Sequence, residues 1–210
     1  MKDYIRNLLC CVFFALCCSV FAQQVERKDA LKLYNADQYE EAIEVCEKEI
    51  AANPDSLDSY CVLCWALVAN KQYMAAEERA TKARELFPYD VRLIEVLAES
   101  KFYQGKNREA LALFQKYVST APESATRYGR AYFFMGEIYI RQSQFNHADI
   151  ALTTSVRYDS LRYYWWSQLG YAREMCKNYQ TAIIAYNKAL SINPGDYDST
   201  RGKARCESHL

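Results

Sequence analysis

One spacing recurs along the chain and limits its fold more than any other feature of the sequence. Three prolines are equally spaced, at Pro54, Pro88 and Pro122. Five alanines repeat the same spacing independently, except that the third gap is longer by four, at Ala42, Ala76, Ala110, Ala148 and Ala182. The alanines therefore place one four-residue insertion between positions 110 and 148. A fixed period of about 34 residues is typical of stacked structural repeats.

Each period contains two segments with the pattern of an amphipathic helix. Apolar residues recur at helical spacing in the first half, as at Leu63 and Leu67, and in the second half, as at Ala76 and Ala80. Short polar stretches such as 70–72 separate the halves and predict turns. A single helix hairpin cannot bury both of its faces, so neighbouring hairpins are expected to stack into a solenoid.

The residues at fixed positions within the period resemble the tetratricopeptide repeat (TPR), whose pattern is W-x2-L-G-x2-Y, then A-x3-F, then P. The last period carries most of this pattern, in Trp166, Leu169, Gly170, Ala182, Tyr186 and Pro194. The resemblance implies five repeats, at 23–56, 57–90, 91–124, 129–162 and 163–196. The implied fold class is all-α, a right-handed superhelical solenoid of about five helix hairpins. The remaining residues, 197–210, are expected to form a C-terminal capping helix.

Residues 1–22 have the composition of a secretory signal peptide. Lys2 and Arg6 precede an uncharged run at 8–21, and Ala22 offers a cleavage site before Gln23. The run is short for a membrane span, which needs about 20 apolar residues. We therefore expect export, with the periplasm as the destination. An uncleaved anchor, or a lipidated N-terminus at Cys17 or Cys18, remains an alternative.

Charge and motifs exclude several classes of function. The chain has 26 Lys and Arg residues and 26 Asp and Glu residues, whereas nucleic-acid binders carry an excess of cations. The sequence contains no phosphate-binding loop, no dinucleotide-binding glycine motif, no nucleophile elbow and no HExxH motif. His147 and His209 lack the companions that a metal site requires. We expect no enzyme activity, no cofactor, no metal and no nucleic-acid partner.

The pair Cys61-x-x-Cys64 is the only motif that suggests redox chemistry. It lies inside an expected helix without a second pair, and Cys64 occupies a position that the period reserves for small core residues. Burial as small apolar side chains is therefore favoured for these cysteines. A redox-active Cys61 and a disulfide between Cys46 and Cys64 remain open alternatives.

The TPR resemblance implies a binding surface. In that family the first helix of each pair lines a concave groove, and aromatic residues at these positions are expected to face water there. Charged neighbours would set the orientation of a bound partner. The candidate partner-binding residues are Trp65, Arg92, Glu95, Glu99, Phe102, Tyr103, Arg130, Phe133, Phe134, Glu137, Arg141, Tyr164 and Tyr171. Packing between repeats is the alternative role for any one ring.

These features predict a non-enzymatic scaffold that binds a protein or peptide segment of a partner in the groove. The two-carboxylate clamp of chaperone-binding TPR proteins is not expected, because Leu31 and Val62 stand where that clamp needs asparagine or a further cation. Two other classes stay open at this point: a thiol-active exported protein that uses Cys61, and a structural solenoid that assembles with copies of itself.

Overall fold

The computed structural model describes residues 29–210, and every regular element in this range is an α-helix. Residues 1–28, with the expected signal peptide, lie outside the described residues. Consecutive helices form antiparallel pairs, and one helix follows the last pair. The bounds are α2 (Ala30–Asn35) with α3 (Tyr39–Ala52), α4 (Leu57–Ala69) with α5 (Tyr73–Leu86), α6 (Val91–Tyr103) with α7 (Asn107–Thr120), α8 (Tyr128–Arg141) with α9 (Phe145–Tyr158), α10 (Tyr163–Met175) with α11 (Tyr179–Ile192), and then α12 (Tyr197–Glu207).

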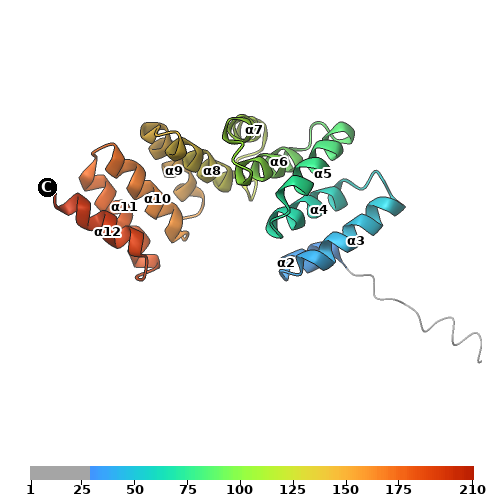
Figure 1. The fold of residues 1–210 in the computed structure, drawn as a ribbon, viewed down its shortest axis with the longest axis horizontal. Helices are drawn as coiled ribbons and strands as arrows, with labels where there is room; N and C mark the ends of the chain where they lie inside the picture. The colour runs from blue at the N-terminus through green and yellow to red at the C-terminus, as the bar shows by residue number, and fades with distance from the viewer. Residues whose placement is uncertain (1–28) are drawn as a thin grey trace, which may run out of the picture.

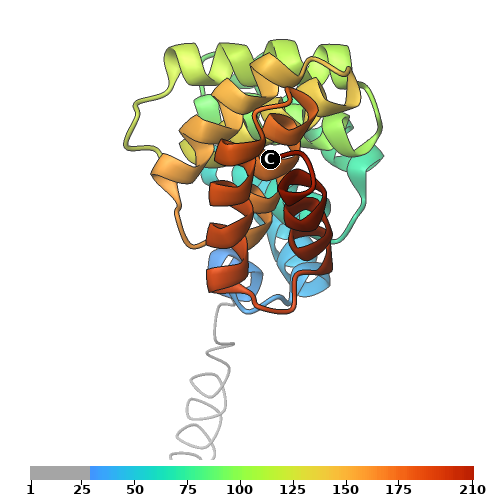
Figure 2. The ribbon, with the colours of Figure 1, turned by 90° about the vertical axis from the view of Figure 1, so that its left-hand side faces the viewer.

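The helix pairs follow one another along an arch, from α2 and α3 at one foot to α12 at the other (Figure 1). The first helix of each pair contacts the first helix of the next pair, from α2 and α4 through to α10 and α12. Within the described range, the second helix of one pair makes no such contact with the second helix of the next pair. The first helices, together with α12, therefore form the inner layer of the superhelix, and the second helices form its outer layer. The view along the arch shows the layers winding around a common axis (Figure 2).

Small residues let the two helices of a pair approach each other closely. A Cβ atom built on Gly136 would lie 2.5 Å from Cγ of Leu152, which belongs to the facing helix α9. A Cβ on Gly170 would lie 2.6 Å from the ring of Tyr186 in α11. Cys64 occupies the same position in its own pair and is fully buried. A small residue at this position of the repeat therefore leaves space for a side chain of the facing helix.

The turn inside each pair repeats one backbone conformation. Asp37, Lys71, Gly105, Ser143 and Lys177 all have a positive φ, between 58° and 76°. The amide that follows each of them donates to a carbonyl five residues earlier, for example from Gln72 N to Leu67 O at 2.8 Å. This is the Schellman arrangement that ends helices, and glycine is its usual residue. Only Gly105 is glycine here, so tertiary packing holds the other four residues in the left-handed region.

The four-residue insertion lies in the connection between α7 and α8. This connection spans 121–127, whereas the connections at 53–56, 87–90 and 159–162 are shorter. Its last residue, Arg127, is the N-cap of α8 and makes no side-chain cap. Tyr128 anchors the start of α8, because its ring is buried and its hydroxyl donates to Val118 O at 2.9 Å. The insertion thus introduces an arginine at the edge of the inner layer.

The C-terminal helix α12 closes the end of the apolar core. It packs against α10 and α11, and Cys206 is buried with Tyr186 in this contact. Charged side chains such as Lys203 and Glu207 lie on its other side, at 35% and 54% exposure. Among the described residues, no helix has the length and apolar character needed to cross a bilayer.

Candidate functional site

Three cavities follow one another along the inner layer. The N-terminal cavity has a volume of about 570 Å³, the middle cavity about 430 Å³ and the C-terminal cavity about 820 Å³. Trp65 borders the first two, and Tyr103, Arg127 and Arg130 border the last two. We call the joined cavities the inner-wall groove. Its further lining residues include Asp58, Arg92, Tyr34, Tyr73, Phe133, Tyr164 and Trp165.

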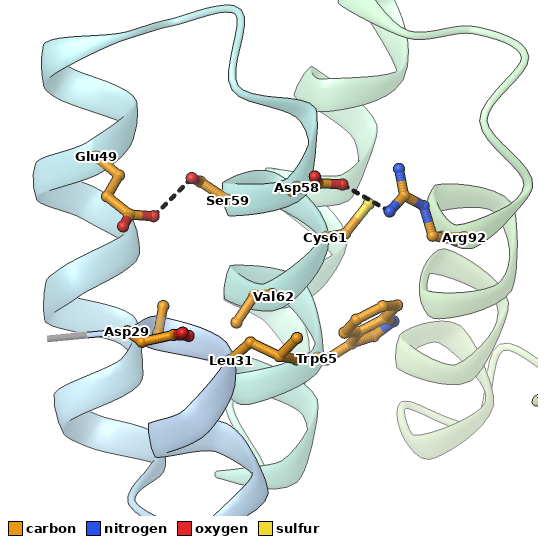
Figure 3. A pocket seen from close by; sticks show the side chains of 10 residues that line it. Asp29, Leu31, Glu49, Asp58, Ser59, Cys61, Val62, Trp65 and Arg92 are labelled. Carbon is orange, nitrogen blue, oxygen red and sulfur yellow. Dashed lines mark hydrogen bonds and ion pairs between the residues drawn. The ribbon is translucent and has the colours of Figure 1, made fainter.

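The N-terminal cavity combines an ion-paired wall with an apolar wall (Figure 3). Arg92 donates to Asp58 at 2.7 Å and to Asp90 at 2.9 Å, so a carboxylate of the preceding repeat helps to hold its guanidinium. Leu31, from α2, and Trp65, from α4, lie below this ion pair in the view of Figure 3. Arg92 is therefore already bound on two sides and keeps few donors for a partner.

Burial contradicts the expected role of three aromatic residues. Phe102, Phe133 and Phe134 are only 4%, 8% and 3% exposed, so the expectation that these rings face water was wrong. Phe134 packs against Phe102 at 4.7 Å between ring centroids and against Phe114 at 5.3 Å. Phe133 stacks on Trp165 of the next repeat at 5.2 Å. These rings join adjacent repeats, and only an edge of Phe133 and Phe134 reaches the groove.

Other candidate residues do reach solvent. Tyr103 and Tyr164 are 42% and 44% exposed and stand on α6 and α10 at the two sides of the C-terminal cavity. Trp65 and Arg130 are partly exposed within the groove. Tyr171 borders a separate cavity of about 330 Å³ near α12, so the structure does not place it in the inner-wall groove.

The two glutamates expected to orient a partner are buried instead. Glu95 and Glu99, one turn apart on α6, have 0% and 1% exposure. Arg130 donates to Glu99, and Arg127 donates to both carboxylates, at 3.4 Å to Glu95 and 3.3 Å to Glu99. Burial raises the pKa of Glu99 above its usual value, and the charge of Glu95 contributes to the rise, while the two arginines oppose it. The expectation that these glutamates act at the surface was therefore wrong, because the arginines cover them.

Sequence reasoning missed Arg127 and Tyr34, which lie at the centre of the groove. Arg127 stands in the inserted segment, and its guanidinium donates to the hydroxyl of Tyr34 in α2 at 3.1 Å. The same guanidinium lies 4.8 Å from the centroid of the Trp65 ring. One side chain at the start of the fourth pair thus touches the first, second and third pairs. The only signal in the sequence was that the insertion contains an arginine.

Glu137 and Arg141 lie on α8, beyond the central cluster. Arg141 lies 4.0 Å from the Phe102 ring centroid and donates to Asn107 Oδ1 at 3.1 Å. Glu137 is half-buried, and its Oε1 atom accepts no hydrogen bond from the described residues. Burial raises the pKa of Glu137 to about 6, and the charge of Arg141 only partly offsets this.

We expect Glu137→Gln to stabilise the protein at pH 8 and to have little effect at pH 4. The folded state raises the pKa of Glu137, so the folded protein binds a proton more tightly than the unfolded chain, and stability falls as the pH rises through this pKa. The neutral amide removes that loss, which amounts to about 1–2 kcal/mol. Urea unfolding at both pH values measures the difference. Glu85→Gln, at an exposed position, is the control. An equal gain at pH 4 would contradict the burial argument.

The described cysteines do not support thiol chemistry. Cys46, Cys61, Cys64, Cys176 and Cys206 are all free thiols, so the open question of a Cys46–Cys64 disulfide is answered by two buried thiols. Burial raises the pKa of the Cys61 thiol to about 12, which disfavours the reactive thiolate near neutral pH. Within residues 29–210, no group of histidine, cysteine and acidic side chains could hold a metal ion.

Two family models match parts of the chain. The tetratricopeptide repeat model matches residues 163–196, which is the range that the period assigns to the last repeat. The model of subunit 3 of the anaphase-promoting complex, or cyclosome, matches residues 35–117. No curated protein shows a significant match to the sequence.

Solved structures share the fold at low sequence identity. PilF of Pseudomonas aeruginosa superposes with a TM-score of 0.75 at 14% identity, over 86% of this chain and 80% of that chain. YrrB, a TPR protein with an unusual peptide-binding site, gives 0.64 at 17% identity, over 83% and 88%. MamA gives 0.64 at 18% identity, over 85% and 98%. The tetratricopeptide repeat model matches one repeat of the chain, and the helix pairs and these likenesses show an all-helical repeat solenoid similar to tetratricopeptide-repeat proteins.

Proposed function

We propose that this protein is a non-enzymatic scaffold that binds an extended or helical segment of a partner protein in the inner-wall groove. The observation that carries the proposal is the groove itself, whose three cavities share residues and run along five successive inner helices. A groove that crosses five helices suits an extended chain segment better than a compact small molecule.

The exposed part of the groove supports a protein partner. Tyr103 and Tyr164 present aromatic surface to solvent beside the guanidinium of Arg130. Tyrosine and arginine are among the residue types that contribute most to binding energy at protein interfaces. The peptide-binding site of the structurally similar YrrB is consistent with this use of the fold.

We also propose that the protein acts in the cell envelope after export to the periplasm. The support is the sequence of residues 1–22, with two cations before an uncharged run and a small residue before Gln23. The mature protein would then begin at Gln23, and its binding groove would face periplasmic partners.

A photo-crosslinking amino acid placed at Tyr103 or Tyr164 in the native host tests both proposals. We expect discrete crosslinked products from these two positions, because both side chains are exposed in the groove. In the same background, alanine at the other tyrosine should lower the yield about tenfold if each ring anchors the partner. Mass spectrometry of the captured product identifies the partner and reads the N-terminus, which is expected to be Gln23.

Met74 and Ile150 are matched control positions. They are 78% and 68% exposed and lie on the outer helices α5 and α9. Equal crosslinking from these positions, or none from Tyr103 and Tyr164, would reject the groove as the binding surface. Any other N-terminus would reject simple cleavage after Ala22.

A further inference from the structure

We propose that the inner wall contains a binding pocket for a guanidinium group, which Arg127 fills in the free protein and which accepts an arginine side chain of a bound partner in its place. Two carboxylates, an indole and a phenol form the pocket, from Glu95, Glu99, Trp65 and Tyr34. The partner's role rests on the proposed function, whereas the pocket itself does not.

The chemistry of the pocket matches a guanidinium on every side. Glu95 and Glu99 are buried carboxylates that accept from it, and Tyr34 accepts a third N–H through its hydroxyl oxygen. Trp65 offers its ring face at 4.8 Å from the guanidinium carbon. A planar cation with five donors suits this combination better than a lysine ammonium, which can neither stack nor form a fork.

Arg127 fills the pocket incompletely. Its contacts with the two carboxylates measure 3.3 and 3.4 Å, whereas charge-assisted hydrogen bonds of this kind are usually about 2.7–2.9 Å. The Oε1 atom of Glu95 is buried and accepts no hydrogen bond from the described residues. A carboxylate with no exposure and an unused oxygen is costly, so it favours a further donor. A guanidinium that is not attached to α8 could reach both carboxylate oxygens of Glu95.

The position of Arg127 allows an exchange of occupants. It borders the middle and C-terminal cavities, and 19% of its side chain is exposed, so a ligand in the groove reaches it directly. The neighbouring Tyr128 is fixed by its buried ring. Displacement therefore requires rotation of one side chain and leaves the helix in place.

The covalent attachment of Arg127 to α8 also weakens the binding of a competing arginine side chain. A side chain attached to the same molecule competes at an effective concentration of about 1 mM. The apparent Kd rises by a factor of one plus this concentration divided by the Kd for the empty pocket. An external arginine that binds the empty pocket with a Kd of about 0.1 mM should therefore bind about tenfold more weakly to the wild-type protein than to a variant that lacks Arg127. This competition would select partners that combine an arginine with further contacts in the groove.

Thermal unfolding of full-length Arg127→Ala with added N-acetyl-arginine amide tests the pocket. We expect this variant to melt several degrees below the wild type, because the buried carboxylate of Glu95 loses the arginine that pairs with it and Glu99 keeps only Arg130. Because a ligand of the folded state stabilises it by mass action, about 20 mM N-acetyl-arginine amide should restore a large part of the loss. The wild type should bind the amide about tenfold more weakly. N-acetyl-lysine amide, which carries the same charge, should restore much less.

Arg92→Ala is the matched control, since Arg92 is an inner-layer arginine whose partner Asp58 is largely exposed. Its other partner, Asp90, also accepts from the backbone N–H groups of residues 92 and 93, so it keeps donors in the variant. The arginine amide is not expected to rescue it. If Arg127→Ala does not fold alone, the same compounds are added during refolding, and recovery of helical circular dichroism replaces the melting temperature.

Three outcomes would overturn the pocket. The arginine and lysine amides could raise the melting temperature of Arg127→Ala equally, the arginine amide could stabilise the wild type as much as the variant, or it could fail to stabilise the variant at all. The crosslinking result at Tyr103 would stand in each case. Conversely, rescue without groove crosslinks would reject the scaffold function and leave the pocket.

Discussion

Replacing Tyr186 by alanine is expected to lower the free energy of unfolding by about 3–5 kcal/mol, the usual cost of removing a large buried ring. Tyr186 is 2% exposed and fills the space among α10, α11 and α12. Its ring packs against the positions of Gly170 and Gly202, which have no side chains to fill the space it would leave. Its hydroxyl donates to Glu174 Oε2 at 2.7 Å, so the variant also loses a hydrogen bond to a charged group.

Urea unfolding followed by circular dichroism measures this effect. Ile184→Ala is the control, because Ile184 lies on the same helix and is 63% exposed. We expect it to change stability by less than about 1 kcal/mol, as is usual for surface positions. A similar loss in both variants would show that the ring does not hold the last pair against α12.

Gly136→Val is expected to destabilise the protein by about 3 kcal/mol, at the upper end of the range for overpacking. Valine in place of glycine would normally help a helix. Here the first added carbon alone would lie 2.5 Å from Leu152 Cγ. Leu152 is fully buried, so a shift of its side chain would displace other residues of a closely packed core. The cost therefore arises from the close contact between α8 and α9.

A double-mutant cycle with Leu152→Ala separates this contact from other effects. Leu152→Ala removes three carbon atoms and Gly136→Val adds three, so the double variant restores the packed volume across the contact. We expect a favourable coupling of about 1–3 kcal/mol between the two substitutions, as for residues in direct contact. Additive losses would mean that Gly136 matters for a reason other than room for Leu152.

The surface of the inner helices could be predicted only in part from the sequence. The repeat pattern placed thirteen candidates on the first helices, and Tyr103, Arg130 and Tyr164 do line the groove with exposed surface. The pattern could not separate them from Phe102 and Phe134, which are buried. An inner helix contacts its own partner helix and both neighbouring repeats, so only a narrow strip of it faces the groove. A shift of one residue moves a side chain from that strip into a contact between repeats.

The sequence by itself determined the helix pairs, their order and the small residues at Gly136 and Gly170, because these follow from spacing along one chain. The tertiary structure alone decided three other features. It holds Lys71 and Ser143 in a conformation that usually needs glycine, because packing of each pair outweighs local preference. It buries the carboxylates of Glu95 and Glu99. It also brings Arg127 to Tyr34, 93 residues away in sequence, because the curvature that joins them is the sum of many small rotations between repeats.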